Sequence, residues 1–546
     1  MSMQKNEKNR NTVTHNKKIN IGVIIATSNG RTELLFSRSL KSVLDQSLLP
    51  DYILIVDDNN NNVHSHEIQE RIRTLQKKSH NTSIYYSRNT HTKGMSGTGS
   101  WNTGFSWYDN KFKENDYIAI LDDDDSWDKT YIEKCIQRIN MCDHFPDQIA
   151  AYLKRSDSNN ASIFSHDDIT ISNFLIRNPG IQGSNMFFRF GIIKKTGGFD
   201  EHLQSCTDRD FMINILMTLP CHHIEIIPEI LIRHFSHPLS VTHDFAKKTK
   251  GLDVFYRKHI ALYTQDVLDK SLVRSEMLFK YPNSNNIKKL WKLVHLHSQT
   301  PKIVIGVAVH NSQKTLLQCI KSILQQQNIK SEIWTLVMDD SSSDNWKDTI
   351  QQELESEKII YWNESFMNVS KTRNCINSFI KEYFGNVKLI GRLDSDDEFA
   401  HPYVLSEIEK IKDNTDADYI IAGNYLKQEG KILGNVNYAN QELLNHKYLL
   451  NRLKQMAEGT AKNELPSCNL FMSPKYIQKY PNIPSAEDHY LTAKILWNRD
   501  KRCVILADKI IATIYSLDGN LTYKNKQNNK HKQARIKIYN EIKKWK

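Results

Sequence analysis

Runs of aspartate stand at two places in the sequence, each directly after an apolar segment typical of a buried strand. The first is Asp122 to Asp125 after "YIAIL", and the second, interrupted by one serine, is Asp394-Ser395-Asp396-Asp397 after "VKLIGRL". Carboxylates this close repel one another, so a nearby cation stabilises them. Mg²⁺ and Mn²⁺ bind oxygen ligands, typically one or two carboxylates together with substrate phosphates. One such run would equally suit a solvated turn or a helix N-cap, but two at matching places favour metal–phosphate sites.

Two Asp-Asp pairs also follow apolar runs. Asp57-Asp58 comes after "YILIV", and Asp339-Asp340 comes after "IWTLVM". A carboxylate at the end of a strand can accept hydrogen bonds from a base N–H or from ribose hydroxyls. The alternative is a turn-forming residue before a loop.

A third acidic position lies further along, in "SCTDRDF" (Asp208) and in "SAEDHYL" (Asp488). Both precede apolar helical stretches, so each carboxylate could accept a proton from an attacking hydroxyl or cap the helix. His234, His237 and His243 follow in the first case only. They would complete a metal shell or lie in the core or on the surface.

These acidic positions recur in the same order and at a nearly constant spacing, which indicates two homologous domains. The segments from Ile19 and from Lys302 both contain a β-branched run, a polar turn, an amphipathic helix and a second apolar run. Strands that alternate with helices predict an α/β domain with a mostly parallel sheet. Ligands bind at the carboxyl ends of such strands, where the Asp pairs and runs lie.

The 546 residues accommodate these two domains with tails and a connection. We expect a basic N-terminal tail (1–18), a first domain (19–255), a helical linker (256–300), a second domain (301–522) and a basic C-terminal tail (523–546). In the last segment Ile538, Ile542 and Trp545 recur at helical spacing. A helix there would either contact an anionic membrane or pack on the second domain, and the remaining alternative is a solvated tail.

Composition excludes several classes. Hydrophobic residues make up 39% and aromatic residues 10% of the chain, which excludes wholesale disorder. No apolar run approaches the roughly 18 residues of a spanning helix, and the polar N-terminus argues against a secretory signal. Eight cysteines without CxxC spacing indicate reduced thiols in a cytoplasmic protein. The net charge of +11 permits an anionic partner, although no basic and aromatic pattern favours nucleic acid.

The order of these motifs resembles the family 2 glycosyltransferases, which have the GT-A fold. The resemblance covers most of both domains. It is most specific in "QGSNMFFRFGIIKKTGGFDEHLQSCTDRDF" (182–211), where a Gly-Gly-Phe-Asp turn precedes Asp-Arg-Asp. It implies two tandem GT-A domains, Rossmann-like in their sheets.

The resemblance also implies roles for individual residues. In the first domain these are nucleotide contacts by Asp57 and Asp58, a diphosphate contact by Asp122, a metal contact by Asp124 and a catalytic base at Asp208. In the second domain the matching residues are Asp339, Asp340, Asp394, Asp396 and Asp488, with Arg373 as a further donor-binding residue.

Both copies depart from the family pattern. The Ala-Arg-Asn segment of the family reads Ser100-Trp101-Asn102 in the first domain, and Thr207 stands where the family has Glu. The second domain keeps Arg373 but lacks the Gly-Gly-Phe turn. Two alternatives therefore stay open: both domains catalyse transfer, or one has decayed into a nucleotide- or glycan-binding module.

The implied reaction is inverting, metal-dependent transfer from a nucleotide-diphosphate sugar to an acceptor hydroxyl, in bacterial-type glycan or glycoconjugate synthesis. The expected cofactor is Mn²⁺ or Mg²⁺ and the expected donor is a UDP-sugar. The acceptor is a glycan, a lipid-linked molecule or a peptide, and the C-terminal tail would provide any peripheral contact with the inner face of the membrane.

Overall fold

The structure is a computed structural model that describes residues 19–77, 82–235, 244–296, 298–518, 525 and 528–545. Two compact units divide between Ser284 and Asn285, inside the segment expected to be a linker. We call them domain one and domain two. The N-terminal tail (1–18), His237 and His243 lie outside the described residues.

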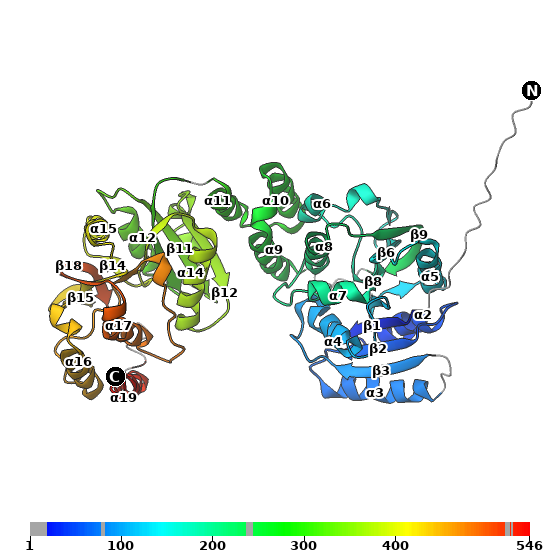
Figure 1. The fold of residues 1–546 in the computed structure, drawn as a ribbon, viewed down its shortest axis with the longest axis horizontal. Coiled ribbons are helices and arrows are strands. Elements are labelled where there is room, and N and C mark those ends of the chain that lie inside the picture. The colour runs from blue at the N-terminus through cyan, green and yellow to red at the C-terminus, as the bar shows by residue number, and fades with distance from the viewer. Residues whose placement is uncertain are drawn as a thin grey trace, which may run out of the picture. The chain divides into compact units, whose positions relative to one another are not determined.

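Each domain contains one mixed nine-stranded sheet, and the strand order is the same in both. Figure 1 shows the strands and helices of the two domains. In domain one the order is β3-β2-β1-β4-β8-β6-β9-β5, with β7 paired to β6. The strands are β1 (Ile21–Thr27), β2 (Tyr52–Asp57), β3 (Ser83–Arg88), β4 (Tyr117–Asp122), β5 (Ser126–Trp127), β6 (Gln148–Arg155), β7 (Ala161–Ser162), β8 (Met186–Arg189) and β9 (Ile224–His234).

Domain two repeats this order as β12-β11-β10-β13-β17-β15-β18-β14, with β16 paired to β15. Its strands are β10 (Lys302–Val309), β11 (Glu332–Asp340), β12 (Ile359–Glu364), β13 (Val387–Arg392), β14 (Glu398–Phe399), β15 (Tyr419–Gln428), β16 (Lys431–Asn437), β17 (Leu470–Met472) and β18 (Val504–Ser516). The prediction of two tandem α/β domains is confirmed.

The sheets are mixed rather than mostly parallel. The first four strands of each path pair in parallel, as β3, β2, β1 and β4 do in domain one. β8 then runs antiparallel to both β4 and β6. Hydrophobic alternation indicates that a segment is a strand but not its direction in the sheet, so the reversal at β8 could not be predicted from it.

Helices cover both faces of each sheet. In domain one they are α1 (Thr32–Leu34), α2 (Leu40–Leu44), α3 (Asn62–Gln76), α4 (Thr98–Tyr108), α5 (Tyr131–Met141), α6 (Ile171–Ile176), α7 (Phe190–Thr196), α8 (Thr207–Thr218), α9 (Phe245–His259) and α10 (Gln265–Phe279). In domain two they are α11 (Ser284–His295), α12 (Leu316–Leu324), α13 (Trp346–Thr349), α14 (Val369–Tyr383), α15 (Val404–Thr415), α16 (His446–Glu458), α17 (Glu487–Trp497) and α19 (Lys530–Ile542).

The central strands are apolar on both faces because helices bury both. Ile303, Ile305 and Val307 of β10 face a core that includes Ile320 of α12. On the opposite face Gly306 lets α14 come close, since a Cβ there would lie 2.4 Å from Ile376. In β1 the close approach is two residues nearer the start of the strand, at Gly22, where a Cβ would lie 2.6 Å from the ring of Tyr108 in α4. These contacts fix the helix that follows the third strand in each domain.

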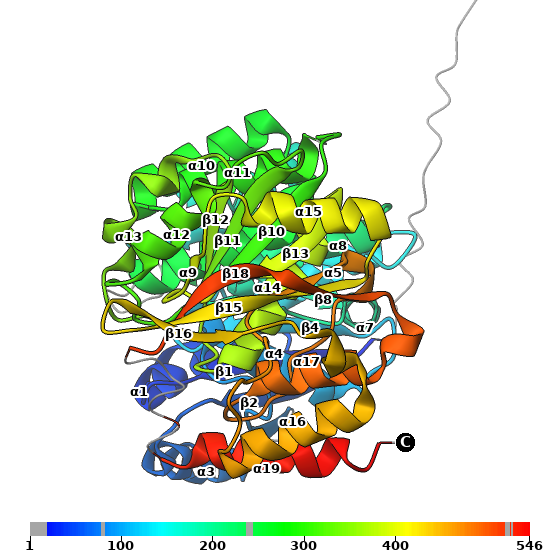
Figure 2. The same ribbon diagram turned by 90° about the vertical axis from the view of Figure 1, so that its left-hand side faces the viewer.

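The C-terminal segment packs on domain two, which was one of the expected arrangements. Helix α19 lies beside α16 and α17 (Figure 2). Ile538 and Ile542 of α19 are buried in the same core as Leu453 of α16, and Trp545 packs against that core. The apolar residues that a membrane helix would insert are therefore already covered. Among the described residues no helix is both long and apolar enough to span a bilayer.

This packing predicts a large difference between two isoleucines of α19. Ile538 is 3% exposed and Ile536 is 40% exposed. Ile538→Ala should lower the free energy of unfolding of domain two by about 2 kcal/mol, because it leaves a cavity in the core. Ile536→Ala should change it by less than about 0.5 kcal/mol. Thermal unfolding of the full chain measures both, and equal small effects would show that α19 does not stabilise the domain.

Candidate functional site

The carboxyl ends of three parallel strands bring the acidic positions of each domain together. In domain one β1 lies between β2 and β4, with Thr27 opposite Asp57 and Ala26 opposite Asp122. Adjacent strands are about 4.8 Å apart, so the ends of β2 and β4 lie within about 10 Å. In domain two β10 is flanked by β11 and β13 in the same way.

The Asp-Asp pairs hold the loops around each site. Asp57 is buried and accepts hydrogen bonds from the backbone and side chain of Asn59, from Tyr86 and from Arg88, at 2.7–2.8 Å. Burial opposes ionisation, yet hydrogen bonds, among them those from Asn59 and Tyr86, lower the pKa of Asp57. Asp58 accepts from Asn89 Nδ2 and from the backbone N–H of Gly94, both at 2.8 Å. Asp57 is thus fully engaged by protein donors, and Asp58 positions the loop that precedes α4.

The corresponding pair in domain two also bonds to backbone. Asp339 Oδ1 accepts from Ser342 N at 3.2 Å. Asp340 accepts from the backbone N–H groups of Phe366, Met367 and Asn368 and from Thr372 Oγ1, at 2.6–2.9 Å. Although burial opposes it, these bonds lower the pKa of Asp340. Asp340 therefore fixes the start of α14.

The four aspartates after β4 have different surroundings. Asp123 is buried and accepts from Thr27 Oγ1 at 2.8 Å, and it also lies 3.0 Å from Arg31 Nη2. Asp124 pairs with Arg31 Nη1 at 2.7 Å. Asp125 is buried and accepts from His234 Nδ1 at 3.0 Å. Among the described residues, no side chain donates to the Asp122 carboxylate.

The pKa values of these aspartates are raised because the carboxylates are buried and lie close to one another. Burial, together with the negative charges of Asp125, Asp124 and Asp208, raises the pKa of Asp122 well above its ordinary value. Burial and Asp124 raise the pKa of Asp123 to about 7 despite Arg31. Burial likewise raises the pKa of Asp124. The neighbouring cations thus only partly offset the burial and mutual repulsion of these carboxylates.

Asp208 joins this cluster from the first turn of α8. The preceding cap residue, Cys206, has a positive φ of 66°, a conformation that costs energy for a residue other than glycine and is common at functional sites. The Gly183 backbone N–H donates to Asp208 Oδ1 at 3.2 Å. Burial raises the pKa of Asp208 to about 6. The structure thus brings Asp122 and Asp208 within electrostatic reach of one another.

In domain two the corresponding carboxylates are paired with arginines. Arg373 of α14 places Nη2 at 2.8 and 3.0 Å from the two oxygens of Asp394, and its Nη1 contacts Glu487. Arg392 places Nη2 at 3.4 Å from Asp394 Oδ2 and at 3.4 Å from Asp488 Oδ2. Burial opposes ionisation of Asp394 and Asp488, but the arginines help to lower the pKa of both.

The other two aspartates of this run keep raised pKa values. Burial and the charge of Asp394 raise the pKa of Asp396 to about 6. Burial and the charge of Asp396 raise the pKa of Asp397 well above its usual range, even though Asp397 accepts from Ser516 N at 2.9 Å. The arginines therefore neutralise Asp394 and Asp488 rather than the whole run.

Matching hydrogen bonds establish which residues of the two sites correspond. Asn102 donates to Phe199 O and accepts from Phe199 N, both at 2.9 Å. Asn374 makes the same pair of bonds to Tyr480, at 2.9 and 2.8 Å. Trp101 therefore occupies in domain one the position of Arg373 in domain two.

The ends of the last long strands also correspond. The backbone N–H of Phe235 donates to Asp125 at 2.9 Å, as that of Ser516 does to Asp397. His234, which precedes Phe235, therefore matches Tyr515. The N-caps of α8 and α17 agree as well, since Ala486 has a φ of 59° at the position of Cys206.

Sequence reasoning missed Arg392 and Arg31. Arg392 lies inside an otherwise apolar strand, and a charged residue in that setting is nearly always paired when buried. That signal was available in "VKLIGRL". Arg31 follows β1 in a polar loop, where a basic residue is unremarkable, so its pairing with the aspartates could not be predicted.

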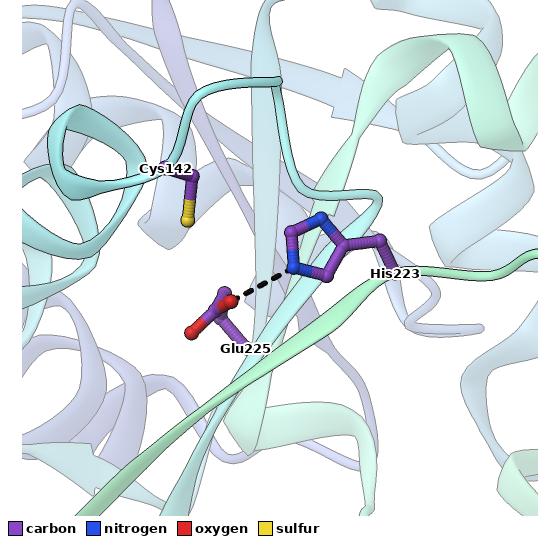
Figure 3. A group of neighbouring side chains, drawn as sticks. All are labelled: Cys142, His223 and Glu225. Atoms are coloured by element: carbon purple, nitrogen blue, oxygen red, sulfur yellow. Dashed lines mark hydrogen bonds and ion pairs between the residues drawn. The ribbon is translucent and has the colours of Figure 1, made fainter.

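A separate group of ligand-type side chains lies elsewhere in domain one. Cys142, His223 and Glu225 point toward one another (Figure 3), with His223 Nε2 at 2.8 Å from Glu225 Oε1. Glu225 lies nine residues before His234 along β9, about 30 Å away at 3.3 Å per residue. Glu225 also lies 3.6 Å from Arg138. This group is therefore distinct from the acidic site.

A comparison with protein families matches each domain separately. The model of the family described as Glycosyl transferase family 2 matches residues 22–197 and 304–472. These segments contain the Asp pairs and runs of both domains and end before Asp208 and Asp488. An "Uncharacterized glycosyltransferase" of Rickettsia bellii (strain RML369-C) is 21% identical over 347 residues, covering 60% of this chain and 49% of that protein. The chain thus spans about half the length of this curated relative.

Two solved structures resemble about half of the chain. The structure of S. aureus TarS has a TM-score of 0.33 and 16% identity, and the match covers 50% of this chain and 48% of that one. The structure of the mannosyltransferase PcManGT from Pyrobaculum calidifontis, in complex with GDP-Man and Mn²⁺, has a TM-score of 0.35 and 14% identity. The match covers 52% of this chain and 77% of that one.

Proposed function

Because the chain belongs to glycosyltransferase family 2, a family of enzymes, we propose that domain one transfers a sugar from a nucleotide-diphosphate sugar to an acceptor hydroxyl. The observation that carries this proposal is the convergence of Asp122, Asp124 and Asp208 at the ends of parallel strands. We propose a UDP-sugar as the donor and a glycan, lipid-linked molecule or peptide in bacterial-type glycan synthesis as the acceptor.

The donor set of domain one fits a hard divalent cation. Asp122 has no side-chain donor among the described residues, and Arg31 contacts only one oxygen of Asp124. His234 bonds to Asp125 through Nδ1, which orients its other nitrogen as a ligand in the manner of carboxylate–histidine pairs. We propose that Asp122, Asp124 and His234 hold Mn²⁺ or Mg²⁺. When bound, the cation offsets the charge of the departing diphosphate.

The chain's own residues account for the proton transfer. Asp208 takes the proton of the acceptor hydroxyl, and the hydroxyl oxygen forms a bond to the anomeric carbon. The bond from that carbon to the diphosphate oxygen breaks, and the nucleoside diphosphate leaves. Attack from the face opposite the leaving group inverts the anomeric configuration. A pKa near 6 leaves Asp208 ionised at neutral pH and still able to accept a proton.

The Asp-Asp pairs serve nucleotide binding in this proposal. Asp58 and the loop that it holds would contact the nucleoside. Asp57 would help to position them through its hydrogen bonds with Arg88 and Tyr86. In domain two Asp339 and Asp340 have the same positions. The burial and hydrogen bonds of Asp57 and Asp340 favour an indirect role for these two carboxylates.

Domain two is a second candidate transfer site or a nucleotide-sugar-binding module. Its Asp394 is ion-paired with Arg373 and Arg392, and that donor set does not fit a cation at Asp394. Asp488, the matching base, accepts hydrogen bonds from Ser467 and Arg392, so its carboxylate is already engaged by protein donors. We propose that domain one carries the transfer activity and that domain two binds a nucleotide sugar.

Any contact with a membrane would be electrostatic. Lys532, Lys537 and Lys544 on or beside α19 are exposed, whereas Ile538 and Ile542 of this helix are buried in the core of domain two. Each basic residue near an anionic leaflet contributes about 1 kcal/mol. A peripheral contact of this kind would place domain two beside a lipid-linked acceptor and would disappear at high salt.

The experiment that tests the proposed function is a donor panel scored by release of the nucleoside diphosphate. We expect turnover with one UDP-sugar in Mn²⁺ or Mg²⁺, loss of that turnover in excess EDTA, and its return when metal is restored. Asp124→Asn should show the same loss. Full turnover in excess chelator would contradict the metal role, and no turnover with any donor would contradict the enzymatic role.

A further inference from the structure

Arg392 is a buried cation inside the acidic site of domain two. It is 8% exposed and lies at the end of β13, two residues before Asp394. Ile120 has the same place in domain one, two residues before Asp122 in β4. The two domains therefore differ by a full positive charge beside their first aspartate.

The guanidinium of Arg392 lies between the two carboxylates that domain one leaves unpaired. Its Nη2 is 3.4 Å from Asp394 and 3.4 Å from Asp488. The corresponding pair in domain one, Asp122 and Asp208, has no side-chain donor between its members in the part of the chain that the structure describes. Arg392 thus supplies in domain two a cation that domain one lacks.

A second difference acts in the same direction. Domain one has His234 beside its run of aspartates, whereas domain two has Tyr515 at that position. An imidazole nitrogen is a common metal ligand and a tyrosine hydroxyl is not. Arg373 also approaches both oxygens of Asp394. A divalent cation beside Asp394 would lack a histidine ligand and would be repelled by the guanidinium groups of Arg373 and Arg392.

Arg392 retains unused hydrogen-bonding capacity. Among the described residues, its buried Nη1 has no hydrogen-bond partner, and neither does the buried Nε of Arg373. A buried guanidinium N–H without an acceptor is rare in folded proteins. Guanidinium groups bind phosphate oxygens through paired N–H donors, so these atoms are suited to an anionic ligand.

We propose that Arg392 takes in domain two the place that a divalent cation takes in domain one. Domain two then binds the diphosphate of its nucleotide through Arg392 and Arg373, without metal, and the chain binds one cation rather than two. This inference rests on the proposed function, which assigns a nucleotide diphosphate to both sites.

The claim that the chain binds one cation rather than two is tested by counting the Mn²⁺ bound to the full chain. The count is made by electron paramagnetic resonance with UDP present. We expect one ion per wild-type chain, none for Asp124→Asn and one for Asp396→Asn. Arg392→Ile, which installs the residue of domain one, should weaken the exclusion and raise the count toward two. Two ions in the wild type, one of them lost in Asp396→Asn, would overturn the inference even if Arg392→Ile fails to fold.

The claim that domain two binds the diphosphate without metal is tested by measuring UDP binding in excess EDTA. We expect one UDP per chain to remain bound, and its affinity to fall at least tenfold in Arg392→Met. Loss of all UDP binding in EDTA would overturn the proposal. Failure of the proposed function would look different: one Mn²⁺ and one EDTA-resistant UDP with no turnover on any donor would support this inference while rejecting the transfer activity. A chain that binds no Mn²⁺ would overturn both.

Discussion

Asp208→Asn should lower the rate of sugar transfer by about 10²–10⁴-fold, the usual contribution of a positioned proton acceptor. The substitution keeps the shape of the side chain, and an amide oxygen can still accept the 3.2 Å bond from Gly183 N. What it removes is the ability to take a proton from the acceptor hydroxyl. Donor binding and thermal stability should therefore stay close to wild type.

Steady-state transfer and equilibrium binding of the donor, measured on the same protein, separate this role from a helix cap. A cap alone predicts an unchanged rate with lower stability. The matched variant is Asp488→Asn in domain two. If domain two only binds nucleotide, this variant should leave the transfer rate of domain one unchanged, whereas loss of a second, distinct transfer reaction would establish two active domains.

The sequence allowed the tandem domains and the positions of their carboxylates to be predicted because both depend on local pattern. Apolar runs that end in aspartate place Asp57 and Asp122 at strand ends, and parallel pairing with β1 then brings those ends together. The same reasoning holds for Asp340 and Asp394. Nothing more than hydrophobic periodicity and the geometry of a parallel sheet is needed for this part of the site.

The pairing of charges could not be predicted in the same way, because it joins residues from distant segments. Arg373 and Glu487 meet only once α14 and α17 pack around the site, and Arg31 reaches Asp124 across a loop. The mixed order around β8 has a similar origin, since a strand of four residues does not encode its own direction. These differences decide which carboxylates remain free for chemistry.

Arg373→Met should destabilise domain two by about 3–5 kcal/mol, the typical cost of removing one partner of a buried ion pair. Arg373 is 7% exposed and bridges Glu487 and Asp394. Methionine fills a similar volume but leaves the buried Glu487 carboxylate without its partner. Lys371→Met, at an exposed position of the same helix, should change stability by less than about 0.5 kcal/mol.

Domain one lacks both partners of the ion pair between Arg373 and Glu487. Trp101 stands in place of Arg373 and packs on Phe199 with ring centroids 4.8 Å apart. Thr207 stands in place of Glu487, so the arginine and the carboxylate that it would pair with are absent together. The double variant Arg373→Met with Glu487→Gln should therefore recover at least half of the lost stability, because it removes the unpaired charge.

Scanning calorimetry of the full chain measures these variants, and the transition that Ile538→Ala shifts identifies domain two. The expected order of stability is wild type, then the double variant, then Arg373→Met. If the double variant is no more stable than the single one, the cost of losing Arg373 comes from its contact with Asp394 or from packing rather than from Glu487. Removing one partner of a stabilising buried ion pair costs several kcal/mol. If Arg373→Met costs less than about 1 kcal/mol, Arg373 therefore contributes little to the stability of the fold, and its role is to bind an anion.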